Sequence, residues 1–278
     1  MKILVLGYKG TLGRYVYTYL KSKNYDIIGL SRENLDVSDY DEGHLRAVFL
    51  HKSLKKNDVI INCIGAIKPM VDKYGTLNAI KINSLFPHLL SNGCEKDGHK
   101  MIHITTDCVF SGNDGLYNEN SPHDCIDVYG KTKSLGEPAN CTVVRTSIIG
   151  EEIDTSRSLL EWIKSTKDKT ANGFTNHKWN GLTCLQVAKV FEEIIKNDYF
   201  WKGVRHIHSP NIFTKLEIVQ TVSDIYDLNI TLNPVEAAVK CDRTMSTIYN
   251  DIKFDIPDIK TQIKEQYEYK PILISNII

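Results

Sequence analysis

The chain has 278 residues, of which 42% are hydrophobic and 24% are charged, and its formal net charge at pH 7 is zero. This composition predicts a globular chain that buries one large core, or a large domain plus a small one. A zero net charge argues against binding to nucleic acid or to a membrane surface. No apolar stretch reaches the roughly 18 residues of a membrane span, and no signal-peptide pattern follows Met1.

The cysteines are scattered along the chain, and no two of them form a C-x-x-C pair. This spacing favours a reduced, cytoplasmic protein over a disulfide framework or a zinc site, so we expect no bound metal. The seven cysteines are Cys63, Cys94, Cys108, Cys125, Cys141, Cys184 and Cys241.

The first predicted elements are a short apolar strand over residues 2–6, a glycine turn over 7–13 and a helix that runs to about Lys23. Small residues let the backbone turn tightly and approach a pyrophosphate, whose charge meets the N–H groups and dipole of the new helix. The spacing is G-x-x-G-x-x-G, and an ordinary glycine-rich turn is the alternative interpretation. The residues expected to hold the cofactor here are Gly7, Gly10, Thr11, Leu12 and Gly13.

A second strand, over residues 26–30, is followed by Ser31 and Arg32. Arg32 lies 19 residues beyond Gly13. At this place a carboxylate suits the ribose 2′-hydroxyl of NAD, whereas a guanidinium suits the 2′-phosphate of NADP. We therefore predict NADP(H), while Glu33 keeps NAD(H) open and a solvated arginine is the alternative. Asp36 is placed to meet an adenine amino group. The residues expected on the adenosine side are Ser31, Arg32, Asp36 and Val37.

A helix over about residues 40–53 leads to a third strand over 58–63, which ends in small residues that would lie close to the cofactor. The residues expected there are Cys63, Ile64 and Gly65. A long helical pattern then runs to Cys94. Asn83 sits amid its apolar residues and is either a satisfied core group or a residue that orders water and the catalytic loop. We also expect it among the cofactor-binding residues.

The fourth predicted strand, residues 101–104, is followed by Thr105 and Thr106, whose hydroxyls would lie at its carboxyl end. Further on, Tyr129 and Lys133 are four residues apart, so on a helix they project from one face. A fixed ammonium near a phenol favours the phenolate and brings its pKa nearer the working range. A hydroxyl, a phenol and an ammonium together can hold and protonate a ketone.

A fifth strand over residues 141–146 completes an alternation of strands and helices, which predicts an α/β fold with a Rossmann-like, doubly wound parallel sheet. After Gly150 the pattern changes to an amphipathic helix from Ser158, a polar and aromatic loop over 174–183, a helix over 185–196, a strand over 204–207, a helix over 216–226 and a strand over 230–232. We expect residues 1–150 and 182–208 to form the NADP-binding domain. A smaller interleaved α/β substrate-binding domain would comprise residues 151–181 and 209–278.

Four motifs carry a resemblance to a known family: the glycine turn, Thr106-Asp107-x-Val109-Phe110, the Tyr129 to Lys133 segment, and Arg145-Thr146-Ser147. Together they resemble the extended short-chain dehydrogenase/reductase family, and within it most of all the dTDP-4-dehydrorhamnose reductases. The likeness covers roughly the first 185 residues. It implies an NADPH-dependent oxidoreductase that reduces the 4-keto group of a 4-keto-6-deoxy nucleotide sugar in the biosynthesis of a rhamnose-type deoxysugar.

The resemblance also assigns roles to residues. Tyr129 would protonate the 4-keto oxygen, Lys133 would bind the nicotinamide ribose, and Thr106 would hydrogen-bond the same keto oxygen. A hydroxyl that caps a strand end is the alternative for Thr106, and a solvated helix face is the alternative for Lys133. Thr105 is expected at the cofactor. The residues expected at the substrate are Asp107, Trp179 and Arg243.

Cys108 departs from the reductase pattern, in which an aromatic residue follows Thr-Asp. A cysteine here is similar to GDP-fucose synthases and plant-type rhamnose synthases, which implies a bifunctional 3,5-epimerase/4-reductase. His177 would be the second acid/base, because it lies in the substrate-side loop and titrates near neutrality. A small buried cysteine and an idle histidine are the alternative.

The loop over residues 176–183 is longer and more aromatic than in the reductases, so the substrate's sugar and base stay open among UDP, GDP, dTDP and CDP sugars. Trp179 would stack on the substrate or pin the loop. Some proteins of this superfamily resemble cofactor-bound regulatory subunits related to the methionine adenosyltransferase β subunit, and that non-catalytic function stays a third alternative. The sequence leaves the oligomeric state open, with a homodimer as one assembly.

Overall fold

The core of the fold is a six-stranded parallel sheet with the strand order β10-β5-β4-β3-β1-β2. The computed structural model describes residues 1–39, 45, 48–49, 52–152 and 158–269. β1 lies between β2 and β3, so the direction of winding reverses there. In a doubly wound sheet the crevice at the carboxyl ends of the strands beside such a reversal is where a dinucleotide binds.

The strands and helices of the sheet domain alternate along the chain. The strands are β1 (Lys2–Leu6), β2 (Asp26–Leu30), β3 (Val59–Asn62), β4 (Lys100–Thr106), β5 (Thr142–Thr146) and β10 (Gly203–His206). The helices are α1 (Thr11–Ser22), α3 (Lys68–Tyr74), α4 (Thr76–Ile80), α5 (Phe86–Asp97), α6 (Val128–Ser134) and α8 (Cys184–Lys196). Short turns of helix are η1 (Val37–Asp39), the π-helical η2 (Lys81–Leu85) and η3 (Asp107–Val109).

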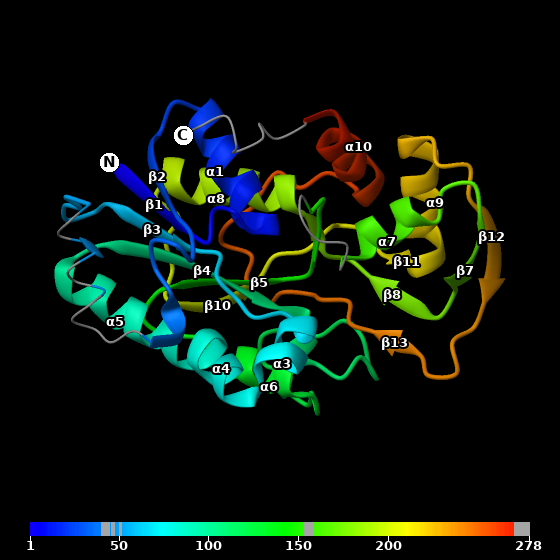
Figure 1. The fold of residues 1–278 in the computed structure, drawn as a ribbon, viewed down its shortest axis with the longest axis horizontal. Coiled ribbons are helices and arrows are strands. Elements are labelled where there is room, and N and C mark those ends of the chain that lie inside the picture. Colours follow the sequence, from blue (N-terminus) through cyan, green and yellow to red (C-terminus); the bar gives the residue numbers. More distant parts are fainter. Residues whose placement is uncertain (40–44, 46–47, 50–51, 153–157, 270–278) are drawn as a thin grey trace.

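Helices cover both faces of this sheet (Figure 1). On one face α1 and α8 pack together over a core that includes Tyr15, Val187 and Phe191. On the other face α5 covers a second core that includes Ile60 and Phe86. Strands buried on both faces read as continuous apolar runs, which is why β1 and β3 contain almost no polar residues. The predicted fold class is confirmed.

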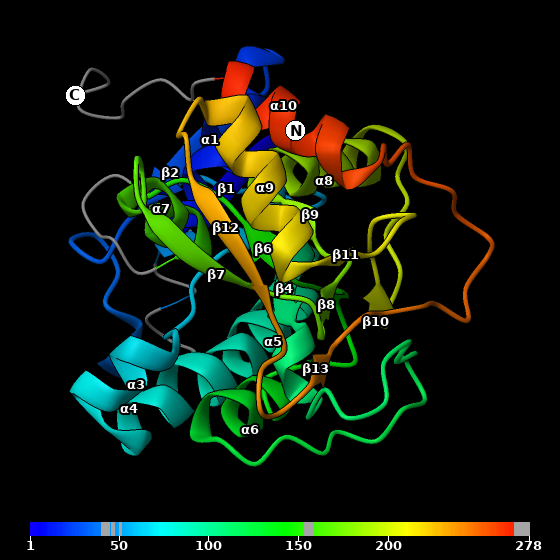
Figure 2. The ribbon, with the colours of Figure 1, turned by 90° about the vertical axis from the view of Figure 1, so that its right-hand side faces the viewer.

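A smaller part stands beside the carboxyl ends of the strands and contains three small sheets (Figure 2). Its strands are β6 (Ile148–Ile149), β7 (Thr170–Phe174), β8 (His177–Trp179), β9 (Leu182–Thr183), β11 (Phe213–Thr214), β12 (Thr231–Val235) and β13 (Cys241–Asp242). Its helices are α7 (Leu159–Ser165), α9 (Lys215–Tyr226) and α10 (Ile259–Tyr269). Leu160, Ile218 and Ile263 from these helices share one apolar cluster.

Several elements differ from those expected. The loop predicted over residues 174–183 contains β8, because that segment finds partners in β11 and β13. The long helix predicted before Cys94 is interrupted by the π-helical turn η2. α10 was not predicted; its Ile259 and Ile263 are buried by packing and not by an obvious sequence pattern. Most of the helix predicted over 40–53 lies outside the described residues, although Leu45, Val48 and Phe49 are helical.

The two proposed domains share contacts that the sequence did not suggest. Ile252 and Phe254, which were expected in the smaller domain, pack against the α1/α8 core, and Tyr269 of α10 contacts Tyr15 and Tyr19 of α1. The domain boundaries therefore stay a prediction. None of the described helices is long and apolar enough to cross a membrane, and the described residues contain no cluster of three or more metal-ligating side chains.

Candidate active site

The glycine turn between β1 and α1 forms an open cradle. Gly7 has φ of +78°, which favours glycine, and its N–H donates to the Leu30 carbonyl at 2.7 Å. A Cβ at Gly13 would lie 2.2 Å from the Gly7 carbonyl oxygen, so only glycine fits there. α1 has no side-chain cap and no acidic residue in its first turn. Its first N–H groups are therefore available to a phosphate.

Next to this turn, a cavity of about 320 Å³ lies at the carboxyl ends of β1, β2 and β3. Nine of the residues predicted to bind the cofactor line it: Gly7, Gly10, Ser31, Arg32, Asp36, Val37, Cys63, Ile64 and Gly65. Thr11 begins α1, and the Leu12 side chain is buried in the core, so Leu12 can contribute only its backbone. The shape and the donors of this cavity fit the adenosine and pyrophosphate of a dinucleotide.

Sequence reasoning missed four residues that line the same cavity: Lys9, Leu35, Met70 and Ile82. Lys9 lies inside the glycine turn, so its position in the motif could have suggested it. Met70 and Ile82 come from α3 and η2, and no sequence signal indicated that these elements border the second and third strands.

Tyr129 and Lys133 lie on α6, whose first turn is capped by the Asp127 carboxylate, which accepts from the Gly130 N–H at 2.8 Å. The Lys133 ammonium is buried and donates to the Ile104 carbonyl of β4 at 3.0 Å. It also lies near Gly65, where a Cβ would be 3.9 Å from Nζ. Lys133 therefore connects α6 with the strand that carries Thr106 and with the rim of the cofactor cavity.

The effect of Lys133 on Tyr129 differs from the one we expected. Burial is the largest influence and raises the pKa of the Tyr129 phenol; Cys108 adds to this rise, and the Thr106 hydroxyl opposes it. Burial also lowers the pKa of Lys133 to about 8, against the opposing charge of Glu137. The prediction of a phenol acidified by its neighbouring amine is therefore wrong for this structure. A phenol that keeps its proton is suited to act as an acid.

Asn83 holds the cofactor-side loop against α6. Its side-chain oxygen accepts from the Ala66 N–H at 2.8 Å, and its amide nitrogen donates to the Ala66 carbonyl at 3.0 Å and to Thr132 Oγ1 at 3.1 Å. These bonds satisfy the amide, which supports the core-group interpretation. Thr105 is buried on β4, and its hydroxyl has no hydrogen-bond partner among the described residues.

Thr106, Asp107 and Cys108 form a tight turn at the end of β4. The Thr106 hydroxyl donates to Asp107 Oδ1 at 3.0 Å and accepts from the Cys108 N–H at 3.2 Å. Arg243, which follows β13, donates to the Phe110 carbonyl at 2.8 Å, so the smaller part reaches this turn. Burial raises the pKa of Asp107, and Arg243 opposes that rise. The structure thus brings the predicted substrate residues Asp107 and Arg243 together.

Cys108 and His177 are not joined by any contact in the described part of the chain. His177 lies on β8, its Nε2 is 3.0 Å from the Val239 carbonyl, and its ring packs on Phe174 with a centroid distance of 4.8 Å. Burial, with the nearby Asp107 charge, raises the pKa of Cys108 to about 12, so the thiol stays protonated near neutrality. The pairing of these two residues stays a prediction.

Trp179 packs against the apolar cluster of the smaller part. Its ring also lies against Gly181, where a Cβ would come 2.6 Å from the indole. These contacts favour the interpretation that Trp179 holds the segment around β8 in place.

A second cavity, of about 380 Å³, lies between α7, β7 and α9. It is lined by Leu159, Trp162, Asn172, Gly173, Phe174, Lys215 and Val219.

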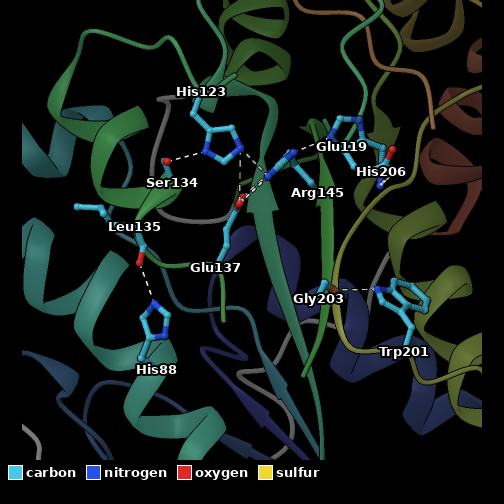
Figure 3. Close-up of polar contacts among 10 residues, drawn as sticks. All are labelled: His88, Glu119, His123, Ser134, Leu135, Glu137, Arg145, Trp201, Gly203 and His206. Atoms are coloured by element: carbon cyan, nitrogen blue, oxygen red, sulfur yellow. Dashed lines mark hydrogen bonds and ion pairs between the residues drawn. The ribbon is translucent and has the colours of Figure 1, made fainter. Parts of the chain in front are cut away.

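Buried Arg145 is the centre of a hydrogen-bond network near the end of α6 (Figure 3). Arg145 on β5 donates to both oxygens of Glu137, at 3.0 and 2.5 Å, and to the Nε2 atoms of His206 and His123 at 2.7 and 2.8 Å. Because arginine only donates, both imidazoles accept and are neutral. His123 Nδ1 then donates to Ser134 Oγ at 2.6 Å, at the end of α6.

The same guanidinium stacks on Phe110 at 5.3 Å, and Phe110 immediately follows η3. Arg145 therefore contacts Phe110 in the segment that follows Thr106, and it reaches Ser134 at the end of α6 through His123. The Arg145-Thr146-Ser147 motif was noted in the sequence, but no role was predicted for its arginine. No local pattern indicates this role, because the three acceptors, Glu137, His206 and His123, come from three separate segments.

Comparisons with known proteins agree with this architecture. The family model described as RmlD substrate binding domain matches residues 1–243. Methionine adenosyltransferase 2 subunit beta of Danio rerio is 25% identical over 245 residues, which are 82% of this chain and 74% of that protein. The dTDP-4-keto-6-deoxy-D-glucose reductase of Streptomyces niveus is 29% identical over 152 residues, which are 52% of this chain and 51% of that protein.

Among solved structures, the dTDP-4-dehydrorhamnose reductase of Bacillus anthracis in complex with NADP superposes with a TM-score of 0.79. It is 16% identical, and the match covers 97% of this chain and 99% of that one, which establishes a shared fold. The family model covers most of the chain, including the glycine turn, the turn after β4 and α6. The chain therefore belongs to the RmlD substrate binding domain family, within the extended short-chain dehydrogenase/reductase fold.

Proposed function

We propose that this protein is an NADPH-dependent reductase of the 4-keto group of a 4-keto-6-deoxy nucleotide sugar. The observation that carries this proposal is the placement of Tyr129 and Lys133 on α6 beside Thr106 at the end of β4. The glycine turn and its cavity lie at the same edge of the sheet. Phenol, hydroxyl and dinucleotide cavity are then arranged for reduction of a carbonyl.

In the proposed reduction, Tyr129, Thr106 and Lys133 each have a separate role. When bound, NADPH supplies a hydride to the carbonyl carbon. The Tyr129 hydroxyl gives its proton to the carbonyl oxygen, and burial favours the protonated phenol that this step needs. The Thr106 hydroxyl holds the same oxygen, and Lys133 holds the nicotinamide ribose while its bond to the Ile104 carbonyl fixes α6 against β4.

We place the sugar between the turn after β4 and Arg243, and the nucleoside toward the cavity in the smaller part. That cavity offers the aromatic rings of Trp162 and Phe174 together with the Lys215 ammonium, a combination that suits a base and a phosphate. The identity of the base is not part of the proposal.

A bifunctional 3,5-epimerase/4-reductase is a second candidate. Cys108 supports it, because this thiol lies next to Thr106 and acts on the pKa of Tyr129. His177 would have to be the partner base, although its contacts are with Val239 and Phe174.

A cofactor-bound, non-catalytic regulatory subunit is a third candidate. It is favoured by the match to methionine adenosyltransferase 2 subunit beta, which extends over 82% of this chain, whereas the reductase match extends over 52%. The presence of Thr106, Tyr129 and Lys133 together favours the enzyme.

The deciding experiment follows NADPH oxidation with a freshly generated 4-keto-6-deoxy nucleotide sugar. We expect turnover by the wild type, a loss of about 100-fold or more in Tyr129→Phe, and no change in Tyr249→Phe, an exposed tyrosine. Tight NADPH binding without turnover of any such sugar would favour the regulatory subunit. Deuterium incorporation from heavy water at C3 and C5, lost in Cys108→Ser, would favour the bifunctional enzyme.

A further inference from the structure

Glu137 is a buried carboxylate that lies just beyond the helix of Lys133. The chain continues to turn after the end of α6, because the Gly136 N–H donates to the Lys133 carbonyl at 3.0 Å. The Lys133 ammonium bonds to the Ile104 carbonyl of β4. The Glu137 carboxylate, four residues further along the chain, accepts from Arg145 of the neighbouring strand β5. The end of α6 thus places a cation and an anion over two adjacent strands.

Arg145 binds both oxygens of this carboxylate. Its Nε donates to Oε1 at 3.0 Å and its Nη2 to Oε2 at 2.5 Å, which fixes the plane of the carboxylate (Figure 3). In the register of β4 and β5, Thr105 is the partner of Arg145, so the carbonyl that holds Lys133 belongs to the residue before that partner. The ammonium and the guanidinium are therefore held at neighbouring strands, and the Glu137 carboxylate acts on both cations.

Burial makes this carboxylate important for the charge of Lys133. The side chains of Arg145 and Glu137 are 2% and 6% exposed, and Lys133 is 5% exposed, so their charges are weakly screened. Arginine keeps its charge in proteins, whereas a buried lysine readily loses its proton. The charge of Glu137 opposes the lowering of the Lys133 pKa by burial. Without this carboxylate, Lys133 would lose its proton at a lower pH.

Other titratable groups around Lys133 are uncharged near pH 7. Tyr129 lies one turn earlier on α6, Cys63 follows β3, and His103 lies on β4. Burial raises the pKa of the phenol and of the thiol, and it lowers the pKa of the imidazole well below its usual value. Among these neighbours, Glu137 is therefore the group that can stabilise the charged form of Lys133.

We infer that Glu137, held in place by Arg145, is a positioning residue for Lys133 and keeps its ammonium charged where it would hold the nicotinamide ribose. This inference rests on the proposed function, which assigns that ribose to Lys133. An ammonium forms stronger hydrogen bonds than a neutral amine, so NADPH binding should weaken when Lys133 loses its proton. Glu137 then sets the alkaline limit of cofactor binding. Arg145 moderates this effect, because both cations share one carboxylate.

The test titrates Lys133 in the full chain in two ways. The first follows the carbon-13 chemical shift of the lysine Cε atoms from about pH 6 to about pH 10, and the Lys133 signal is assigned by its absence in Lys133→Met. The second measures the affinity for NADPH over the same range. In the wild type the Lys133 transition should fall near pH 8, because burial lowers the pKa of Lys133 to about 8, and NADPH binding should weaken above it.

Variants of the ion pair should move this transition in opposite directions. Glu137→Gln should lower it by about one pH unit, which weakens NADPH binding about five- to tenfold above pH 8. Arg145→Met removes the cation that competes for the carboxylate, so it should raise the transition. The double variant Arg145→Met/Glu137→Leu leaves neither charge of the pair buried and should again lower the transition. It decides the question if Glu137→Gln does not fold.

Glu161 provides a matched control, because its carboxylate is 13% exposed and pairs with Lys164 at 3.1 Å on α7, in the smaller part. Glu161→Gln should leave the Lys133 transition and the affinity for NADPH unchanged. The inference is overturned if the Glu137 variants keep the transition of the wild type, if they shift it no more than Glu161→Gln does, or if Arg145→Met shifts it in the same direction as the double variant.

The titration separates this inference from the proposed function. Opposite shifts of the Lys133 transition, without turnover of any keto sugar, would uphold the role of Glu137 and overturn the reductase. Turnover by the wild type, combined with an unchanged Lys133 transition in the Glu137 variants, would uphold the reductase and overturn the role of Glu137.

Discussion

The two ends of the dinucleotide site are built differently. The end that carries Tyr129 and Lys133 is the catalytic end of the proposed function, and its charged groups are buried and hydrogen-bonded to fixed partners: Lys133 to the Ile104 carbonyl and the nearby Arg145 to Glu137. At the adenosine end Lys9 and Glu33 pair in solvent. The proposed reduction would need a proton donor held at one place, which fits the fixed hydrogen bonds of the first end. The exposed pair at the second end is free to change partners when a ligand binds.

The two kinds of ion pair should differ in how much their loss lowers the free energy of unfolding. A buried ion pair that loses one partner leaves an uncompensated charge, which is strongly destabilising, whereas an exposed pair is screened by water and ions. Removing one partner of the buried Arg145–Glu137 ion pair should therefore destabilise the whole fold, whereas removing one partner of the exposed Lys9–Glu33 pair should not.

The largest expected effect is that of Arg145→Met. This change leaves the Glu137 carboxylate, which is 6% exposed, without its cation, so the free energy of unfolding should fall by about 3–5 kcal/mol. Urea denaturation measures it. The double variant Arg145→Met/Glu137→Leu should recover a large part of the loss, because no charge is left buried. Equal losses in both variants would show that packing, and not the ion pair, holds this region.

Acid should weaken the same region through His206. Burial, with the Arg145 charge, lowers the pKa of His206 to about 4, below the value near 6.5 of an unfolded chain. The unfolded state then binds more protons between these values, so stability present above about pH 6.5 is lost as the pH falls toward 4, by roughly 2–3 kcal/mol. Unfolding midpoints at several pH values should fall less steeply in His206→Gln. An identical slope would contradict the assignment.

Lys133→Met should separate function from stability. Burial lowers the pKa of Lys133 to about 8 from 10.5, so the charged form is disfavoured in the folded state and stability from this group rises with pH between these values. Removing the ammonium should therefore destabilise the fold by no more than about 1 kcal/mol, while turnover falls by about 100-fold or more. The rise of stability above pH 8 should be smaller in the variant. A large loss of stability at neutral pH would show that the bond to Ile104 is structural.

Features that depend on neighbouring residues of one segment could be predicted from the sequence. Gly7, Gly10 and Gly13 have their spacing because the backbone must turn and pack closely, so the glycine turn was predictable from the local pattern alone. The same holds for β1 and β3, whose apolar runs reflect burial on both faces. Tyr129 and Lys133 could be paired because one helix carries both.

Groups whose positions depend on several segments could not be predicted. Arg145 bonds to residues from separate loops and strands, and the sign of the pKa shift of Tyr129 follows from burial that no spacing encodes. β8 was taken for a loop because its partners, β11 and β13, lie far along the chain. In each case the cause is tertiary packing, which local propensity does not determine.

The smallest effect on the fold should come from Lys9→Gln and Glu33→Gln. Both side chains lie in solvent at the rim of the cavity, so each change should shift the melting temperature of the ligand-free protein by less than about 1 °C. Lys202→Gln, which removes an exposed ion pair with Glu95, should have an equally small effect. Differential scanning calorimetry measures this. A drop of more than about 4 °C would mean that the pair fixes the glycine turn against β2. The adenosine end would then be as rigidly built as the catalytic end, because a pair that fixes two segments is not free to change partners when a ligand binds.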